Sequence, residues 1–134
     1  MRPRSPYHAR VSRDDLTLSE FKRLVDEALE SLPERFAAMV RNVVIAVEEE
    51  PGAEDLEALG PDAEPHEELL GIYRGVALTE RGYEPPMFPD EIAVFRGPIL
   101  RTTRTRRDAL QQIRETVIHE LGHYFGLSDD EMHV

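Results

Sequence analysis

The sequence predicts an α+β fold, in which helices pack on a small mixed β-sheet and a long helix lies near the C-terminus. Three observations support this prediction. Apolar residues recur at helical spacing near both ends of the chain, short β-branched runs lie between them, and no internal repeat is present in the sequence. The 134 residues and 40% hydrophobic content suit one core. We therefore expect a single domain over residues 1–134, with a flexible N-terminal arm over residues 1–14.

Two helices and a strand are predicted in the first third of the chain. Thr17 and Glu20 stand three residues apart as in a capping box, and apolar residues at helical spacing follow them. Pro33 either ends this helix or begins a second short helix that reaches about Val40. Residues 42–47 are apolar and rich in β-branched side chains, which favours a first strand.

An acidic stretch follows this strand. Between Arg41 and Arg74 there is no Lys or Arg, and ten acidic residues and three prolines fall between positions 48 and 68. We interpret residues 49–69 as a solvated acidic loop excursion with a short helix at 55–59; an acidic rim that attracts basic peptides is the functional alternative. The formal net charge of the chain is −11, so we expect no nucleic-acid partner.

Two further strands and a long helix complete the predicted order. The strands are expected at 73–78 and 92–95, with a proline-rich loop over 82–89 between them. The helix is expected over 105–125, with Thr105 as its N-cap. It carries a broad apolar arc and one polar stripe, which consists of Gln112, Thr116, His119 and His123. Such a stripe on a mostly buried helix lines a cleft, unless its members are satisfied polar groups of the core.

The most informative motif lies at the end of this helix, where residues 119–129 read H-E-x-x-H-x-x-G-x-x-D. Residues four apart share one face of a helix, so His119 and His123 can bind a single metal ion. Glu120 points away from that pair, toward a water held by the metal, which is the position of a general base. The alternative interpretation is an ordinary terminal helix with two exposed histidines.

The residues after the motif's second histidine predict a third ligand. Gly126 can adopt positive φ, end the helix and turn the chain back, which returns Asp129 toward the metal. Asp130 is a neighbouring alternative. Three protein ligands leave the fourth zinc position open for water, as in catalytic rather than structural zinc sites.

At these residues the chain resembles the zincin metallopeptidases, and more closely the small bacterial "minimal zincin" proteins. The segments 71–81 and 90–100 are also similar to that family, and the resemblance covers about residues 15–131. It implies one Zn²⁺ ion per chain and a peptide or protein substrate. It assigns the metal ligands to His119, His123 and Asp129 and the catalytic base to Glu120.

The resemblance also implies where the substrate lies. In zincins the substrate is extended along an edge strand above the metal, and the segment similar to this edge is Ile92, Ala93, Val94, Phe95 and Arg96. Metzincins have His in place of Asp129 and a Met-containing turn beneath the metal. Met132 is too close to Asp129 to form that turn, so we interpret it as a tail or packing residue.

The expected function is therefore a zinc metallopeptidase that hydrolyses peptide bonds. The main alternative is a non-catalytic zinc-binding module that acts in protein interaction or regulation. A metal-dependent RNA hydrolase fits less well, because those enzymes use three histidines and a basic face. Tyr73, Tyr83 and Arg96 have the chemistry of an oxyanion donor.

Composition bounds the remaining possibilities. The chain has no cysteine, which excludes disulfides and thiol catalysis and leaves His, Asp and Glu as zinc ligands. It contains no apolar run of membrane-spanning length, and residues 1–13 lack the apolar stretch of a signal peptide. We therefore expect a cytoplasmic protein.

Overall fold

The helices and strands follow the order that the sequence predicts, with one additional helix. In this computed structural model the described residues are 16–58, 68–75, 90–128 and 132. In chain order the elements are α1 (Leu18–Glu30), α2 (Glu34–Val40), β1 (Val44–Glu48), α3 (Ala53–Glu57), β2 (Gly71–Arg74), β3 (Glu91–Phe95), α4 (Arg96–Thr102) and α5 (Arg106–Phe125).

The three strands form one mixed sheet in the order β1-β3-β2. β1 runs parallel to β3, with Ile45 opposite Ile92, whereas β2 runs antiparallel to β3, with Tyr73 opposite the same residue. β3 is therefore the central strand, hydrogen-bonded on both sides. Residues 92–95 of this strand are completely buried.

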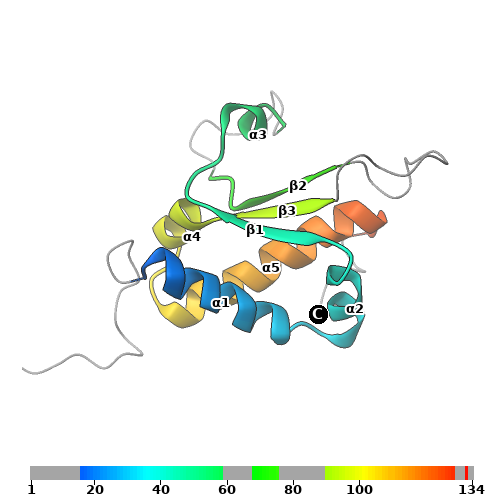
Figure 1. Cartoon of the computed structure of the whole chain (residues 1–134), viewed down its shortest axis with the longest axis horizontal. Helices are drawn as coiled ribbons and strands as arrows, with labels where there is room; N and C mark the ends of the chain where they lie inside the picture. The colour runs from blue at the N-terminus through cyan, green and yellow to red at the C-terminus, as the bar shows by residue number, and fades with distance from the viewer. Residues whose placement is uncertain (1–15, 59–67, 76–89, 129–131, 133–134) are drawn as a thin grey trace, which may run out of the picture.

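The helices α1, α2 and α5 lie on one side of the sheet and α3 lies on the other (Figure 1). α5 contacts α1, β2 and β3. The side chains at the centre of the core come from α1, β3 and α5: Phe21, Leu24, Ile92, Val94, Ile113, Val117 and Leu121. Burial of each such side chain contributes about 1.5–3 kcal/mol, so α5 is firmly packed against the sheet. The predicted α+β fold, with helices on a small mixed sheet and a C-terminal helix, is confirmed.

Local signals at the helix ends act as the sequence indicates. The Thr17 hydroxyl accepts a hydrogen bond from the Glu20 N–H at 3.2 Å, which confirms the predicted N-cap. Pro33 separates α1 from a second short helix, α2, and occupies the N-cap position of that helix. Of the two alternatives for Pro33, the structure therefore has the second helix. Proline suits a helix start because the first N–H groups of a helix have no partner within it.

The predicted strand over 92–95 is confirmed as β3, but the helix that follows it was not predicted. The strand ends at Phe95, and α4 follows immediately from Arg96. Pro98 explains the difference, because it has no N–H for a strand ladder but fits the first turn of a helix. The prediction that residues 92–96 form an edge strand is wrong, since β3 is central and Arg96 is a buried helical residue.

Two arginines form ion pairs with acidic residues in the described parts of the acidic stretch. Arg74 on β2 forms ion pairs with Glu48 and Asp55 at 2.8 Å and with Glu91 at 3.2 Å. Its hydrogen bonds lower the pKa of the Glu48 and Asp55 carboxyl groups below their ordinary values. The short helix α3 begins at residue 53 rather than 55, and the Asp55 carboxylate accepts the Gly52 N–H at 2.9 Å.

Arg101 makes the second set of contacts to the acidic stretch. It pairs with Glu50 at 2.8 Å and with Glu68 at 2.5 Å. The charges at both ends of the predicted excursion are thus partly neutralised by arginines that lie outside it. Residues 59–67 of the excursion and the predicted arm over residues 1–14 lie outside the described residues, as do residues 76–78 of the predicted second strand.

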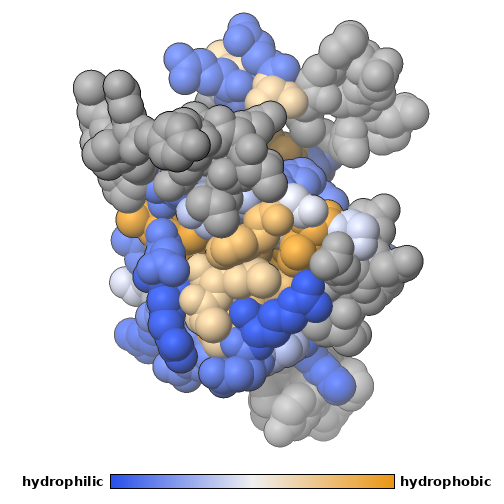
Figure 2. Space-filling model, turned by 90° about the vertical axis from the view of Figure 1, so that its right-hand side faces the viewer, coloured by the Kyte–Doolittle hydropathy of each residue, from blue (hydrophilic) through white to orange (hydrophobic). Residues whose placement is uncertain are grey.

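Figure 2 views the side of the molecule on which α2 and the C-terminal end of α5 lie. It shows apolar surface among hydrophilic side chains and residues outside the described ranges. Ala37 and Met39 of α2 and Phe125 of α5 are only partly buried where they pack on the core. No helix in the described ranges is long and apolar enough to cross a membrane.

Candidate active site

α5 carries the motif and has a defined start and end. The Thr105 hydroxyl accepts the Asp108 N–H at 3.0 Å, which confirms the predicted N-cap. At the other end Gly126 has φ 68° and ψ 35°, the left-handed conformation that favours glycine. The Gly122 carbonyl accepts N–H groups from Gly126 and, at 2.8 Å, from Leu127. The helix therefore stops where the sequence predicts.

α5 brings His119, Glu120 and His123 together. The ligand atoms of the three side chains all lie within 4.8 Å of one another. The imidazole rings meet edge to face, with centroids 4.6 Å apart. Both histidines are exposed, whereas Glu120 is only 8% exposed. Zinc–nitrogen bonds are about 2 Å long, so two imidazoles this close can share one ion after small side-chain rotations, and the donor set fits zinc.

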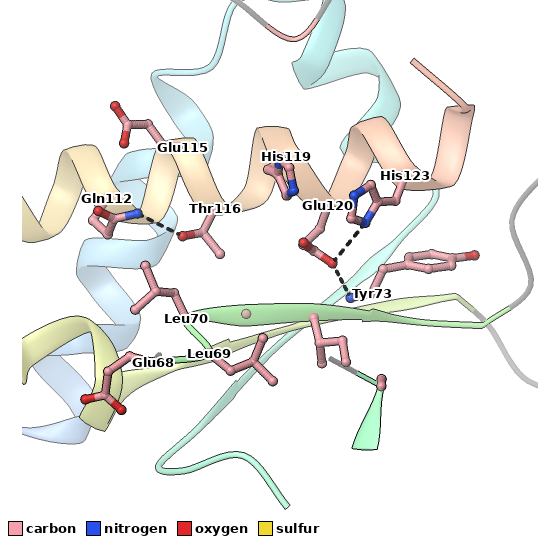
Figure 3. Close-up of a pocket in the computed structure, with 13 residues that line it drawn as sticks. Glu68, Leu69, Leu70, Tyr73, Gln112, Glu115, Thr116, His119, Glu120 and His123 are labelled. Carbon is pink, nitrogen blue, oxygen red and sulfur yellow. Dashed lines mark hydrogen bonds and ion pairs between the residues drawn. The ribbon is translucent and has the colours of Figure 1, made fainter. Parts of the chain in front are cut away.

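Glu120 is oriented by the neighbouring strand. Its Oε1 accepts the backbone N–H of Tyr73 at 2.7 Å and lies 3.7 Å from His123 Nδ1 (Figure 3). A hydrogen bond to a carboxylate is stronger than a neutral one, and this carboxylate is largely shielded from solvent. The side chain that follows the first histidine is therefore held between β2 and the second histidine.

A cleft of about 630 Å³ runs between β2 and the polar stripe of α5. All four predicted stripe residues, Gln112, Thr116, His119 and His123, line it, which confirms the interpretation of the stripe as a cleft wall. Its size falls within the range of about 300–1,000 Å³ that is typical of ligand pockets. The opposite wall consists of residues 68–73. The site thus has room for a substrate beside the two histidines.

Some backbone groups of β2 point toward this cleft and not toward β3. The Leu70 carbonyl accepts the Phe95 N–H at 2.9 Å, which fixes the hydrogen-bonding phase of the antiparallel pair. Bonded and outward-facing residues alternate in such a pair, so the N–H and C=O groups of Gly71 and Tyr73 point away from β3. Among the described strands, β2 is therefore the edge beside the candidate site.

The position of β2 as the edge strand beside the site was not predicted from the sequence. The run Ile92–Phe95 is the more apolar of the two segments and resembles the family's edge, but strand order depends on pairing between distant residues. The only local signal was Gly71. A Cβ at this position would lie 2.5 Å from Thr116 Cγ2 and 2.8 Å from the Ala93 carbonyl oxygen, so glycine permits β2 to pack closely on α5.

Two of the three candidate oxyanion donors are engaged elsewhere. The Tyr73 hydroxyl donates to Asp90 Oδ1 at 2.7 Å, and the ring extends away from Glu120 (Figure 3). The Arg96 guanidinium binds the Leu16 carbonyl and, at 3.0 Å, the Glu49 carboxylate, and it does not line the cleft. Tyr83 lies outside the described residues.

The predicted third ligand is not placed by the structure. Asp129, like its alternative Asp130, lies outside the described residues. The described neighbour Met132 packs against the core, which agrees with its interpretation as a packing residue.

Comparisons with known proteins agree with the site. No curated protein matches the chain. Among solved structures, a conserved hypothetical protein from Thermus thermophilus is 27% identical, with a TM-score of 0.51, over 81% of this chain and 92% of that chain. A family model for zincin-like metallopeptidases matches residues 40–134, which include all three strands and the whole of α5. Because this match extends over most of the chain and includes the helix that pairs His119 with His123, the chain belongs to the zincin-like metallopeptidase family.

Proposed function

We propose that the protein is a zinc-dependent metallopeptidase. The observation that carries this proposal is the position of Glu120, which is buried beside two exposed histidines and lines a cleft next to the edge strand β2. A structural zinc site would not require a cleft of this size beside its ligands. Family membership supports the same conclusion.

His119 and His123 would hold the zinc ion, with Asp129 as the third ligand. When bound, zinc lowers the pKa of a water molecule and polarises the carbonyl of the substrate. Glu120 takes the proton from the attacking water and passes it to the leaving amine. Its short hydrogen bond from the Tyr73 N–H orients the carboxylate while its Oε1 remains close to His123.

The substrate would be an extended peptide paired with β2. The backbone groups of Gly71 point away from β3 and toward the cleft, whereas the Tyr73 N–H is bound to Glu120. Backbone pairing with an edge strand binds peptides without a requirement for particular side chains. The stripe from Gln112 to His123 covers eleven helical steps, or about 16 Å. At about 3.3 Å per residue, a wall of this length accommodates about five residues of an extended chain.

The test is cleavage of a diverse peptide pool by zinc-loaded protein, read by mass spectrometry. Glu120→Gln is the matched control, because its amide oxygen can still accept the Tyr73 N–H and the histidines are unchanged. We expect new peptide termini with the wild type and almost none with the variant. Equal cleavage by both proteins would exclude Glu120 as the base.

A zinc-binding module without catalysis is the second candidate. The hydrogen bond between Glu120 and Tyr73 favours it, because this bond joins α5 to β2 and gives the carboxylate a structural use. The same experiment separates the two functions. Tight zinc binding without cleavage of any peptide in the pool would support the module.

A further inference from the structure

The candidate cleft changes character with distance from the two histidines. Toward Gln112 its strand-side wall is apolar, because the half-buried side chains of Leu69 and Leu70 line it. Leu70 points toward Gln112 and Thr116 on the helix (Figure 3). No lysine or arginine is among the described residues that line the cleft. This part of the cleft therefore offers an apolar wall without a positive charge.

Two carboxylates border this apolar part. Glu115 lies on the helix side and Glu68 on the strand side (Figure 3). Arg101 binds both oxygens of the Glu68 carboxylate, at 2.5 and 3.0 Å. Glu115 is exposed and accepts a hydrogen bond from the Gln111 amide at 3.2 Å, but it forms no ion pair with a described residue. Its negative charge is therefore available to a molecule in the cleft.

Glu115 has a defined distance from the candidate metal ligands. It precedes His119 by four residues of α5, which corresponds to about 6 Å along the helix axis. An extended peptide advances by about 3.3 Å per residue. Glu115 is therefore about two substrate residues away from the histidines, on the side of Gln112.

We propose that the cleft selects peptides with a lysine or arginine about two residues from the cleaved bond, and that Glu115 is the specificity-determining residue. This inference rests on the proposed function. The aliphatic stem of the basic side chain packs on Leu69 and Leu70, while its charged end stays at the exposed rim beside Glu115. Lysine and arginine commonly bury the stem in this way and keep the charge in water.

The geometry of β2 restricts this preference to one substrate position. A Cβ on Gly71 would point at Thr116 of α5, so the side-chain direction at position 71 is toward the helix. Residues directly opposite each other in paired strands place their side chains on the same face, and successive residues alternate. The substrate residue opposite Gly71 thus directs its side chain toward α5, whereas its two neighbours point away.

The experiment compares cleavage of peptides that carry lysine or norleucine at each position in turn, with zinc-loaded protein. Norleucine keeps the aliphatic stem without the charge. At one position we expect lysine to be preferred about two- to fivefold, the range for a solvent-exposed ion pair. The preference should decrease as the salt concentration rises. Glu115→Gln should bring the ratio of the two rates close to one.

Glu30→Gln is the matched control. Glu30 is an exposed carboxylate on α1 that does not line the cleft, so this variant changes the net charge equally and should keep the wild-type ratio. A second measurement does not depend on catalysis. Fluorescence anisotropy of the labelled peptides with metal-free Glu120→Gln protein should show the same preference in binding, and the additional Glu115→Gln substitution should remove it.

The outcomes separate this inference from the proposed function. Equal cleavage of lysine and norleucine peptides at every position would overturn the inference and leave the peptidase in place. A preference that persists in Glu115→Gln, or that is lost equally in Glu30→Gln, would show that the net charge of the protein causes it and would also overturn the inference. Cleavage of no peptide would instead refute the proposed function, and the anisotropy measurement would still decide whether Glu115 selects a basic side chain.

Discussion

Substitution of Gly71 by alanine tests the close packing between β2 and α5. The added Cβ would lie 2.5 Å from Thr116 Cγ2 and 2.8 Å from the Ala93 carbonyl oxygen, whereas ordinary contacts begin at 3.4 Å. Thr116 or β2 must therefore move by almost 1 Å. The Ala93 carbonyl of β3 leaves no open space on its side of the new Cβ. Overpacking of this kind costs about 1–3 kcal/mol of the free energy of unfolding. For a chain of this size, the midpoint of thermal unfolding should fall by about 3–10 °C.

The assay compares thermal unfolding of metal-free wild type, Gly71→Ala and Gly52→Ala. A Cβ at Gly52 would meet nothing closer than 3.6 Å, so this variant controls for the general effect of replacing a glycine and should shift the midpoint less. Zinc affinity should not change in Gly71→Ala, because both histidines lie on α5. Peptide cleavage should fall, since moving β2 lengthens the 2.7 Å hydrogen bond between the Tyr73 N–H and Glu120.

Thr116→Ser provides the partner mutation, because it removes the Cγ2 atom that the new Cβ would meet. We expect the double variant Gly71→Ala, Thr116→Ser to be less destabilised than the sum of the two single variants. An unfolding midpoint for Gly71→Ala equal to that of the wild type would refute the reasoning. Strict additivity in the double variant would show that Thr116 is not the group against which β2 packs.

The other predictions concern charge, metal binding and the helix end. Because Arg74 lowers the folded-state pKa of Glu48 and Asp55, their stabilisation is present above their ordinary pKa values of 4.5 and 3.8 and is lost as the pH falls. Arg74→Met should therefore flatten the dependence of stability on pH in this acidic range, as measured by urea denaturation. His123→Ala should abolish zinc binding, measured by metal analysis after dialysis, without lowering the stability of the metal-free protein, because this side chain is 56% exposed. Gly126→Ala should cost about 1–2 kcal/mol, because alanine must then adopt the left-handed conformation at φ 68°; unchanged denaturation would contradict that geometry.

Features encoded by neighbouring residues were predictable from the sequence. The N-caps Thr17 and Thr105 and the C-terminal Gly126 act within a few residues of their own positions, and each is confirmed. The cleft-lining stripe of α5 depends only on helical periodicity, which is the strongest signal that a sequence carries. For this reason the half of the candidate site that lies on α5 was recognisable without the structure.

Features that depend on distant residues were not predictable in this way. The apolar run that ends at Leu100 is buried throughout, and periodicity cannot distinguish a buried strand from a buried helix. The residues after the strand therefore gave no sign of a helix, and α4 was missed. The acidic stretch looked solvated because its cationic partners, Arg74 and Arg101, come from β2 and α4.

One hydrogen bond of the candidate site depends both on local helical spacing and on pairing between distant residues. His119 and Glu120 take their positions from helical spacing alone, but the direction of the Glu120 carboxylate depends on a backbone N–H that is 47 residues earlier in the chain. That N–H faces the helix only because β2 pairs with β3 in the register that places Tyr73 opposite Ile92. A shift of this pairing by one residue would turn the N–H of Tyr73 toward β3 and leave Glu120 without its partner. The register of a strand that contributes no metal ligand therefore determines the orientation of the proposed base.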